Sequence, residues 1–167
     1  MSEFQVQIFA EQDIAQVLDL MRGLAAYERY LDAFAVSGAD LLERGLQDPA
    51  EFTILVAKTE DGTVLGMAVY YLIPFTFDLS PDMVLKELYV AENARSRGVG
   101  EALMARLQQD AKGLGCRRIK WLVLNENTRA KAFYARIGGR QDTKWENWVL
   151  NVPHHVSPKP APTEQVS

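Results

Sequence analysis

The segment Arg95-Ser96-Arg97-Gly98-Val99-Gly100 decides the fold of this chain, because it joins two elements of different periodicity. Residues 83–90 before it are predicted to form a strand. After it, apolar residues recur at helical spacing from about residue 100, at Leu103, Met104, Leu107 and Ala111. Two glycines at such a junction let the backbone approach a ligand, and the first helix amides can then bind phosphate oxygens. Arg95 and Arg97 would add charged donors; a tight turn with two surface arginines is the alternative.

Alternating strands and helices are predicted on both sides of this junction. Before it we expect a strand, two helices and an antiparallel hairpin, at residues 4–9, 13–27, 37–46, 52–58 and 64–73. Asp13 is expected to cap the first helix, and Asp61-Gly62 to form the hairpin turn. After the helix, which ends near residue 113 or 115, we expect a strand, a helix and a last strand, at residues 118–124, 128–137 and 145–152. The fold class is therefore α/β, with a central βαβα unit and antiparallel strands before it.

Composition indicates one globular domain, residues 1–152, followed by a Pro-rich flexible tail at 153–167. The 167 residues are 48% hydrophobic and 24% charged, and the net charge is −4 without a dense basic run, so no nucleic-acid partner is expected. Cys116 is alone, which excludes an intrachain disulfide and a Cys-based zinc site. His154 and His155 are too few ligands for a metal. No leader or membrane-length apolar run is present, so we expect a cytoplasmic protein that spans no membrane.

Two familiar phosphate loops do not fit residues 95–100. A Walker loop needs Gly-Lys-Ser/Thr, which is absent, and a dinucleotide fingerprint needs a third Gly where Leu103 stands. Too few strand and helix units follow to build a doubly wound sheet. A nicotinamide oxidoreductase therefore stays only a remote alternative.

A second motif lies on the helix predicted from residue 128. There Ala130, Phe133, Tyr134 and Ile137 fall on one face, spaced to pack against the sheet. Packing explains Phe133 and Ile137 completely. Tyr134 also carries a hydroxyl that could reach a leaving group, although a helix tyrosine is more often a packing residue.

Together the two motifs resemble the GNAT superfamily of acetyl-CoA-dependent N-acetyltransferases. The acetyl-CoA signature Arg/Gln-x-x-Gly-x-Gly/Ala corresponds to residues 95–100, and the Asn-x-x-Ala-x-x-Phe-Tyr helix to residues 127–134. The likeness covers about residues 4–152. It implies the acyl-CoA N-acyltransferase fold, a mixed and mostly antiparallel central sheet, with acetyl-CoA as co-substrate and no metal. It places the diphosphate on the amides of residues 97–101 and the pantetheine arm along residues 87–90. The cofactor-binding residues that it implies are Leu88, Tyr89, Val90, Arg95, Arg97, Gly98, Val99, Gly100, Glu101, Asn127, Ala130 and Phe133.

A narrower likeness is to the diamine (spermidine/spermine) and thialysine acetyltransferases, through residues 26–28, 40–43 and 66–71. Where the polyamine enzymes carry two adjacent acidic residues before the phosphate loop, this chain has Lys86-Glu87, and Lys86 would repel one ammonium of a polyamine. In the family the acceptor wall follows the first helix, which here would bring Tyr27, Glu28 and Tyr30 to the substrate. Aromatic rings with carboxylates suit an ammonium, and a solvated polar linker is the alternative.

Acetyl transfer to an amine requires loss of an ammonium proton, because an alkylammonium has a pKa near ~10.4. The resemblance gives this step to Glu87, directly or through a water, with a solvated strand-end glutamate as the alternative. Tyr134 is expected to protonate the departing thiolate. Cys116 has no neighbouring His in the sequence, so direct attack is expected instead of a covalent acyl-enzyme.

We therefore expect an N-acetyltransferase acting on the primary amine of a small cationic metabolite, such as a diamine, a polyamine or a lysine analogue. A protein lysine or amino-terminal acceptor is one alternative, and a non-catalytic acyl-CoA-binding sensor is another. The predicted last strand offers an edge that could pair between subunits, so a homodimer is also expected.

Overall fold

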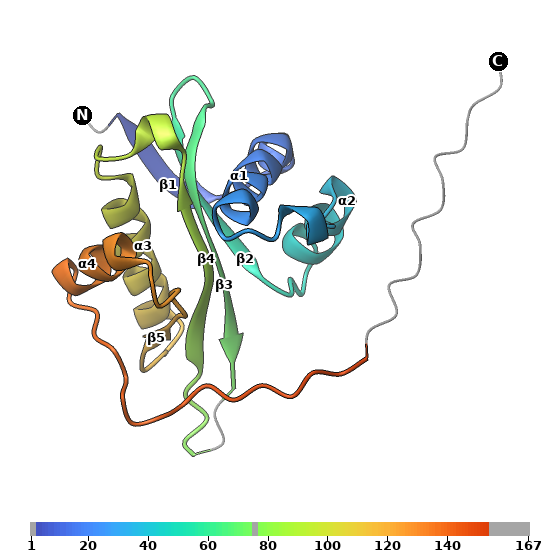
Figure 1. Ribbon diagram of the computed structural model, residues 1–167. Coiled ribbons are helices and arrows are strands. Elements are labelled where there is room, and N and C mark those ends of the chain that lie inside the picture. Colours follow the sequence, from blue (N-terminus) through green and yellow to red (C-terminus); the bar gives the residue numbers. More distant parts are fainter. Residues whose placement is uncertain (1–2, 75–76, 154–167) are drawn as a thin grey trace.

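A five-stranded sheet forms the centre of the protein (Figure 1). The structure is a computed structural model and describes residues 3–74 and 77–153. The strands are β1 (Phe4–Ile8), β2 (Thr53–Thr59), β3 (Val64–Ile73), β4 (Asp82–Val90) and β5 (Ile119–Lys120). They lie side by side in chain order; β1 to β4 are antiparallel, and β5 is parallel to β4. The mixed, mostly antiparallel sheet predicted from the sequence is confirmed.

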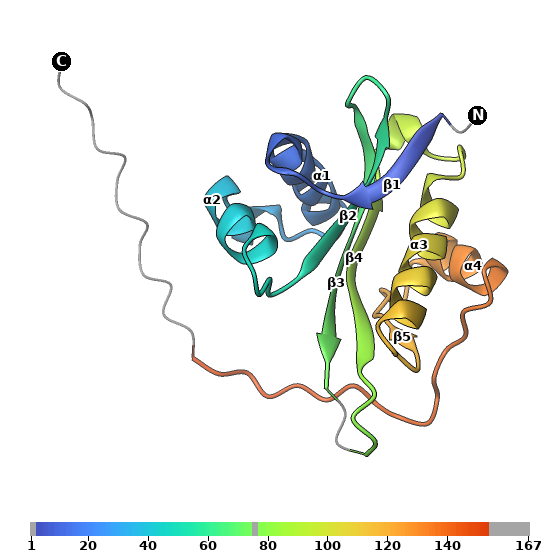
Figure 2. The ribbon, with the colours of Figure 1, turned by 180° about the vertical axis from the view of Figure 1, so that it is seen from behind.

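Helices cover both faces of the sheet (Figures 1 and 2). They are α1 (Ile14–Tyr27), α2 (Gly38–Leu41), which continues as a π-helical turn over Leu42–Leu46, α3 (Val99–Gly113) and α4 (Thr128–Arg136). The pair α1 and α2 lies on one face, and the pair α3 and α4 on the other. Because β5 is parallel to β4, the chain must cross over between them, and α3 makes this crossover.

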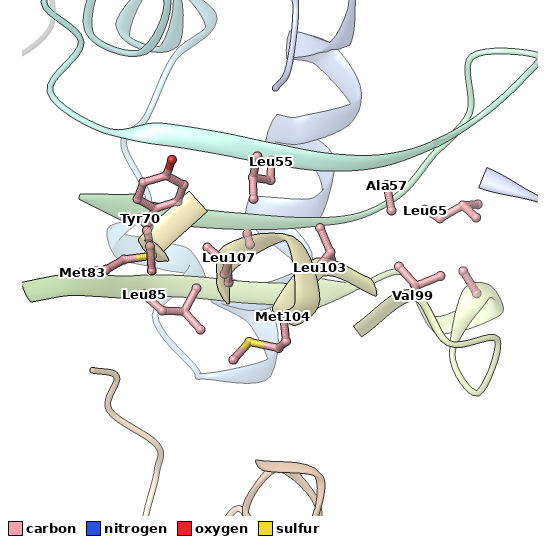
Figure 3. Packing of buried hydrophobic residues seen from close by; sticks show 13 residues of the cluster. Leu55, Ala57, Leu65, Tyr70, Met83, Leu85, Val99, Leu103, Met104 and Leu107 are labelled. Carbon is pink, nitrogen blue, oxygen red and sulfur yellow. The ribbon is translucent and has the colours of Figure 1, made fainter. Parts of the chain in front are cut away.

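Each face of the sheet has its own apolar core. On the α3 side, Leu103 and Leu107 pack over Leu55 and Leu85 of the sheet (Figure 3). On the α1 side, the core includes Val17, Met21, Ile54, Val56 and Met67. Successive residues of β2 therefore alternate between the two cores, and all of them from Ile54 to Ala57 are buried. This part of β2 is therefore shielded from water on both faces of the sheet.

Two predicted strands differ from the structure. The strand expected at 118–124 pairs with β4 only at Ile119 and Lys120, and the strand expected at 145–152 does not form. An extended segment becomes a strand only when a neighbour supplies hydrogen-bonding partners. Residues 121–124 diverge from β4, and residues 140–153 are exposed throughout, so neither segment has such a neighbour among the described residues.

Asp13 does not cap α1 as predicted. It occupies the N-cap position without a side-chain cap bond, and its buried carboxylate instead accepts hydrogen bonds from the Ala10 amide (2.9 Å) and from Nζ of Lys58 (2.8 Å). Of the predicted tail, only Pro153 is described, and His154 and His155 lie outside the described residues. Within residues 3–74 and 77–153, no helix is both long and apolar enough to cross a bilayer.

Candidate active site

A cleft opens where β4 and β5 separate. Their pairing ends at Val84 and Lys120, and beyond that point residues 85–90 and 121–124 line a cavity of about 520 Å³. The end of α1 contributes to its wall, and so does α4, which lies on the opposite face of the sheet. The cleft therefore connects the two faces, and a ligand on one face can reach a ligand on the other.

The N-terminus of α3 faces this cleft with unpaired amides. Gly98, the N-cap residue, has a left-handed backbone with φ +77°, and no side chain caps the helix. The first intrahelical bond runs from the Ala102 amide to the Gly98 carbonyl (3.0 Å), so the amides of residues 99–101 have no partner within the helix. A Cβ at Gly98 would meet nothing within 4 Å, so the space before the helix is open. Such a terminus suits phosphate oxygens.

The two arginines of the loop point to different places. Arg95 lines the cleft, with its guanidinium 5.7 Å from the centre of the Tyr89 ring. Arg97 is not among the lining residues, because its guanidinium forms an ion pair with Glu3. Sequence reasoning could not find this pair, since the partners are far apart in the chain. The loop thus presents backbone amides and Arg95 to the cleft, but not the side chain of Arg97.

A β-bulge at Lys86 reverses the sides of β4. Val69 of β3 pairs with Glu87, while the next residue, Tyr70, pairs with Leu85, so Lys86 is the extra residue. The β4 residues that pack on the α3 side change from odd to even positions across the bulge: Met83 and Leu85 before it, Leu88 and Val90 after it. Simple alternation would place Glu87 in the α3-side core. With the bulge, Glu87 has the same orientation as Tyr89, which packs on the α1 side.

Glu87 is largely buried in the cleft wall, and its Oε2 has no hydrogen-bond partner among the described residues. Burial, the largest cause, raises the pKa of the Glu87 carboxyl above its ordinary value; Lys86 lowers it in part, and Glu28 raises it. A buried carboxylate oxygen without a donor is costly. Its retention at the wall of a cleft is typical of a group that accepts a proton from a ligand.

Three residues at the end of α1 and just after it were predicted to bind the acceptor. Tyr27 and Glu28 line the cleft, and both are exposed. Tyr30 is not a lining residue but lies close by: burial, then the charges of Glu87 and Glu28, raise the pKa of its phenol. Two carboxylates and two phenols are thus brought together at the end of α1, an environment that favours a cation.

Tyr134 lines the cleft from α4. Its ring lies 4.9 Å from that of Trp121 and 5.3 Å from that of Phe133, measured between centroids, which fixes its orientation. Burial, and then the charge of Glu28, raise the pKa of the Tyr134 phenol, so it stays protonated at neutral pH. A Cβ at Gly100 would lie 3.2 Å from Phe133, so the glycine of one motif makes room for the aromatic ring of the other.

Asn127, predicted to contact the pantetheine arm, lines the cleft and also caps α4. Its Oδ1 accepts a hydrogen bond from the Ala130 amide (3.0 Å). The remaining predicted cofactor residues that line the cleft are Leu88, Tyr89, Val90, Gly98, Val99, Gly100, Glu101, Ala130 and Phe133. The carboxylate of Glu101 forms an ion pair with Arg136 at 2.6 Å.

Several lining residues were not predicted as site residues from the sequence: Leu24, Ser96, Trp121, Leu122, Val123, Leu124, Arg129 and Arg136. The lining residues that follow β5, at 121–124, were predicted to continue the strand. They line the cleft because the pairing with β4 ends at Lys120. Cys116 is not a lining residue, and burial, then the charge of Asp82, raise the pKa of its thiol. A thiol in this place has no access to a ligand in the cleft.

Comparisons with known proteins agree with this geometry. The chain is 31% identical over 158 residues to the human spermidine/spermine N(1)-acetyltransferase-like protein 1, covering 90% of this chain but only 22%, about a fifth, of that relative. It is 28% identical over 145 residues to thialysine N-epsilon-acetyltransferase of Sus scrofa, covering 83% of this chain and 85% of the relative. An integron cassette protein from the mobile metagenome of V. cholerae has the same fold, with TM-score 0.74, 26% identity and coverage of 91% and 94% of the two chains.

The Acetyltransferase (GNAT) family matches residues 12–139, a range that includes the loop, α3 and α4. Enzymes of this family use acetyl-CoA as co-substrate, in accord with the open amides at the start of α3. With an uncapped helix N-terminus at the start of α3, a cleft between two separating strands and a family match over most of its length, this chain belongs to the GNAT family of acetyltransferases.

Proposed function

We propose that this GNAT acetyltransferase transfers acetyl from acetyl-CoA to the primary amine of a small cationic metabolite by direct attack. The observation that carries the proposal is that Glu87 and Tyr134 line one cleft from two elements. One is a carboxyl with an unpartnered buried oxygen, and the other is a phenol kept protonated. Such a pair can serve as base and acid in one step.

The amides of residues 99–101 and the guanidinium of Arg95 would hold the diphosphate of acetyl-CoA, as the open N-terminus of α3 supports. The amides of residues 97 and 98 complete the predicted cradle. The pantetheine arm would then extend between the separated strands, past residues 88–90 and Asn127. This course brings the thioester near Tyr134.

The step balances with the chain's own groups. Glu87 removes a proton from the substrate ammonium, directly or through a water, and the amine nitrogen then attacks the thioester carbonyl carbon. The C–N bond forms, the C–S bond breaks, and the Tyr134 phenol gives its proton to the departing sulfur. The nitrogen, which is positively charged after the attack, passes its second proton to the Tyr134 phenolate, and this transfer leaves a neutral amide and restores the phenol. Cys116 lies away from the cleft, which supports direct attack over a covalent acyl-enzyme.

The acceptor would enter from the α1 side, where Glu28, Glu87, Tyr27 and Tyr30 favour a cation. The similarity to relatives named for spermidine/spermine and for thialysine supports diamines, polyamines or lysine analogues as acceptors. We place the reaction in the cytoplasm and the enzyme in a homodimer as parts of the same proposal.

The test is release of free CoA thiol from acetyl-CoA with a panel of putrescine, spermidine, lysine, ornithine, thialysine and a lysine peptide. We expect at least one small amine to stimulate release well above the rate without amine. Stimulation by the peptide alone would favour a protein acceptor. Binding of CoA without amine-dependent release by any member would favour the sensor and refute the proposal.

Replacement of Tyr134 by Phe examines the acid directly. Tyr134→Phe keeps the ring contacts with Trp121 and Phe133 and removes only the hydroxyl. We expect kcat to fall by ~10²-fold, the loss typical of removing a general acid, with the acetyl-CoA KM almost unchanged. Unchanged turnover would remove Tyr134 from the mechanism.

A further inference from the structure

Trp121 lies between two cavities, at the point where β5 separates from β4. The pairing of the two strands ends at Val84 and Lys120, so Trp121 is the first residue of the separated segment. It lines the active-site cleft of about 520 Å³ and also a second cavity of about 240 Å³. Within residues 3–74 and 77–153, no other residue lines both. The Trp121 side chain therefore separates the two spaces.

The second cavity is apolar and lies among α3, β5 and the end of α4, which are close together in the fold (Figures 1 and 2). Its lining residues are Met104, Gln108, Ile119, Trp121, Ile137, Gly138 and Gly139. Gln108 is the only polar side chain of this set, and no charged side chain belongs to it. A cavity of roughly 150 Å³ with apolar walls already holds benzene, a molecule of six carbons. The second cavity therefore has room for an apolar group of this size.

The surrounding chain makes room for the Trp121 ring and fixes it. A Cβ at Gly139 would lie 3.0 Å from Cζ2 of Trp121, tighter than an ordinary van der Waals contact. The Gly139 amide donates a hydrogen bond to the Tyr134 carbonyl (2.8 Å), which holds the turn after α4 against the helix. On its other side, the Trp121 ring packs against that of Tyr134, with 4.9 Å between centroids. The largest side chain type is thus held beside the proposed acid.

We propose that Trp121 limits the acyl group that this enzyme transfers to short chains, by closing the second cavity to the tail of a longer acyl-CoA. The inference rests on the proposed function, in which the thioester sulfur meets the Tyr134 hydroxyl, so that the acyl group lies beside Trp121. An acyl tail is apolar, as is the cavity behind Trp121, whereas the acceptor side of the cleft carries the carboxylates of Glu28 and Glu87. The bonds that form and break are the same for any chain length.

A comparison of two donors, acetyl-CoA and hexanoyl-CoA, tests this role of Trp121. One methylene that a pocket cannot hold costs about 10-fold or more in kcat/KM, so the wild type should use hexanoyl-CoA at least about 100-fold less efficiently than acetyl-CoA. Trp121→Ala should raise the ratio of kcat/KM for hexanoyl-CoA to that for acetyl-CoA by about 10- to 100-fold. The ratio is the readout, because loss of the ring contact with Tyr134 should slow both donors. Trp121→Leu, which keeps an apolar side chain in place, should give a smaller rise.

A second substitution shows whether the tail enters the second cavity. Gln108 lines this cavity from α3, is exposed and does not line the cleft. Adding Gln108→Phe to Trp121→Ala should refill the cavity and return the donor ratio toward that of the wild type, whereas Gln108→Phe alone should leave the ratio unchanged. The control is Trp148→Ala, which removes a tryptophan that is 85% exposed and lines neither cavity. A rise that Gln108→Phe does not reverse would mean that the cleft had only widened, and would overturn the proposal.

Binding measurements separate this inference from the proposed function. Calorimetric titration with acetyl-CoA and with hexanoyl-CoA, in the absence of an amine, requires no turnover. The wild type should bind acetyl-CoA more tightly, and Trp121→Ala should shift the ratio of the two Kd values toward hexanoyl-CoA by about 10-fold or more. If no amine stimulates release of CoA, the proposed function fails, but the Kd ratio still shows whether Trp121 closes the second cavity. An unchanged Kd ratio in both Trp121→Ala and Trp121→Leu, or a wild type that binds the two donors equally, would overturn the inference.

Discussion

The first four strands and the part of the chain after α3 are built very differently. β1 to β4 pair along almost their whole lengths, and β2 is buried on both faces. After α3, β5 pairs at two residues, α4 has no fully buried residue, and residues 140–153 are exposed. We name these parts the paired half (β1–β4 with α1 and α2) and the C-terminal part (β5, α4 and residues 140–153).

The difference shows where stability and binding are located. Strands that pair continuously leave no room for a ligand between them. The cleft begins at the point where the pairing of β4 with β5 ends. Glu87 lies on the last strand of the paired half, while Tyr134 lies in the C-terminal part. Chemistry is therefore expected at the boundary, where one group is held rigidly and the other is held by a few ring contacts.

The largest expected effect is on stability and contrasts two leucines. Leu55→Ala removes a side chain that is fully buried in the paired half, and should lower the free energy of unfolding by about 2–5 kcal/mol. Leu122→Ala, in the C-terminal part and 80% exposed, should change it by less than about 0.5 kcal/mol. Urea unfolding at low protein concentration measures both. An equal loss of unfolding free energy in the two variants would contradict the view that the paired half contributes more to stability than the C-terminal part.

Next in size is the loss of acetyl-CoA binding when a charge is placed at one end of α3. Gly98 and Gly115 flank this helix, both have positive φ, and a Cβ at either meets nothing within 4 Å. Gly98→Glu and Gly115→Glu should thus lose similar stability, about 1–2 kcal/mol. Only Gly98→Glu puts a carboxylate before the phosphate cradle, where like charges repel by several kcal/mol, so acetyl-CoA affinity should fall about 100-fold or more. Calorimetric titration measures it, and Gly98→Ala controls for strain.

Glu87→Gln should separate activity from stability. As the proposed base, Glu87 must be ionised, so kcat should fall by ~10²-fold or more, and wild-type activity should rise with pH through a pKa above that of an ordinary glutamate. A group with a raised pKa in the folded state favours folding below its unfolded pKa and loses that contribution as pH rises. The neutral Gln variant should consequently melt at a higher temperature than wild type at pH 8, with the gap closing near pH 4.

A matched carboxylate outside the cleft provides the control. Glu51→Gln on the surface should change neither kcat nor the pH dependence of melting, apart from its weak pair with Arg44 (3.6 Å). Loss of activity together with a lower melting temperature at pH 8 would mean that Glu87 is a structural residue. The paired half would then contribute no group to the chemistry.

Local signals in the sequence predicted most of the paired half and the phosphate loop. Helical spacing located α1 and α3, and Asp61-Gly62 located the hairpin of β2 and β3, because these features depend on near neighbours. Tyr134 and most of the residues predicted to bind acetyl-CoA line the cleft, and these residues belong to two short motifs. The bulge at Lys86 was not predictable, because it depends on how β3 and β4 pair.

Features of the C-terminal part were harder to predict for the same reason. The pattern at 145–152 is that of a strand, but whether a strand forms depends on a neighbour, which sequence periodicity does not contain. The ion pair of Arg97 with Glu3 likewise depends on the packing of the two chain regions.

The smallest expected effect concerns which acceptor is preferred. Lys86 is exposed at the bulge, lines the cleft and lowers the pKa of Glu87, so its charge acts on a substrate held there. Lys86→Glu replaces a repulsive charge by an attractive one, and should lower the KM of spermidine by about five- to tenfold at low salt, the size expected for reversing one exposed charge. A lysine analogue, whose carboxylate can pair with Lys86, should lose affinity instead.

Steady-state kinetics with both amines measure the ratio of their KM values. The control is Lys112→Glu on α3, where the lysine is exposed and lies outside the cleft. An unchanged ratio would mean that the bulge turns Lys86 away from the acceptor and that specificity is set by the end of α1.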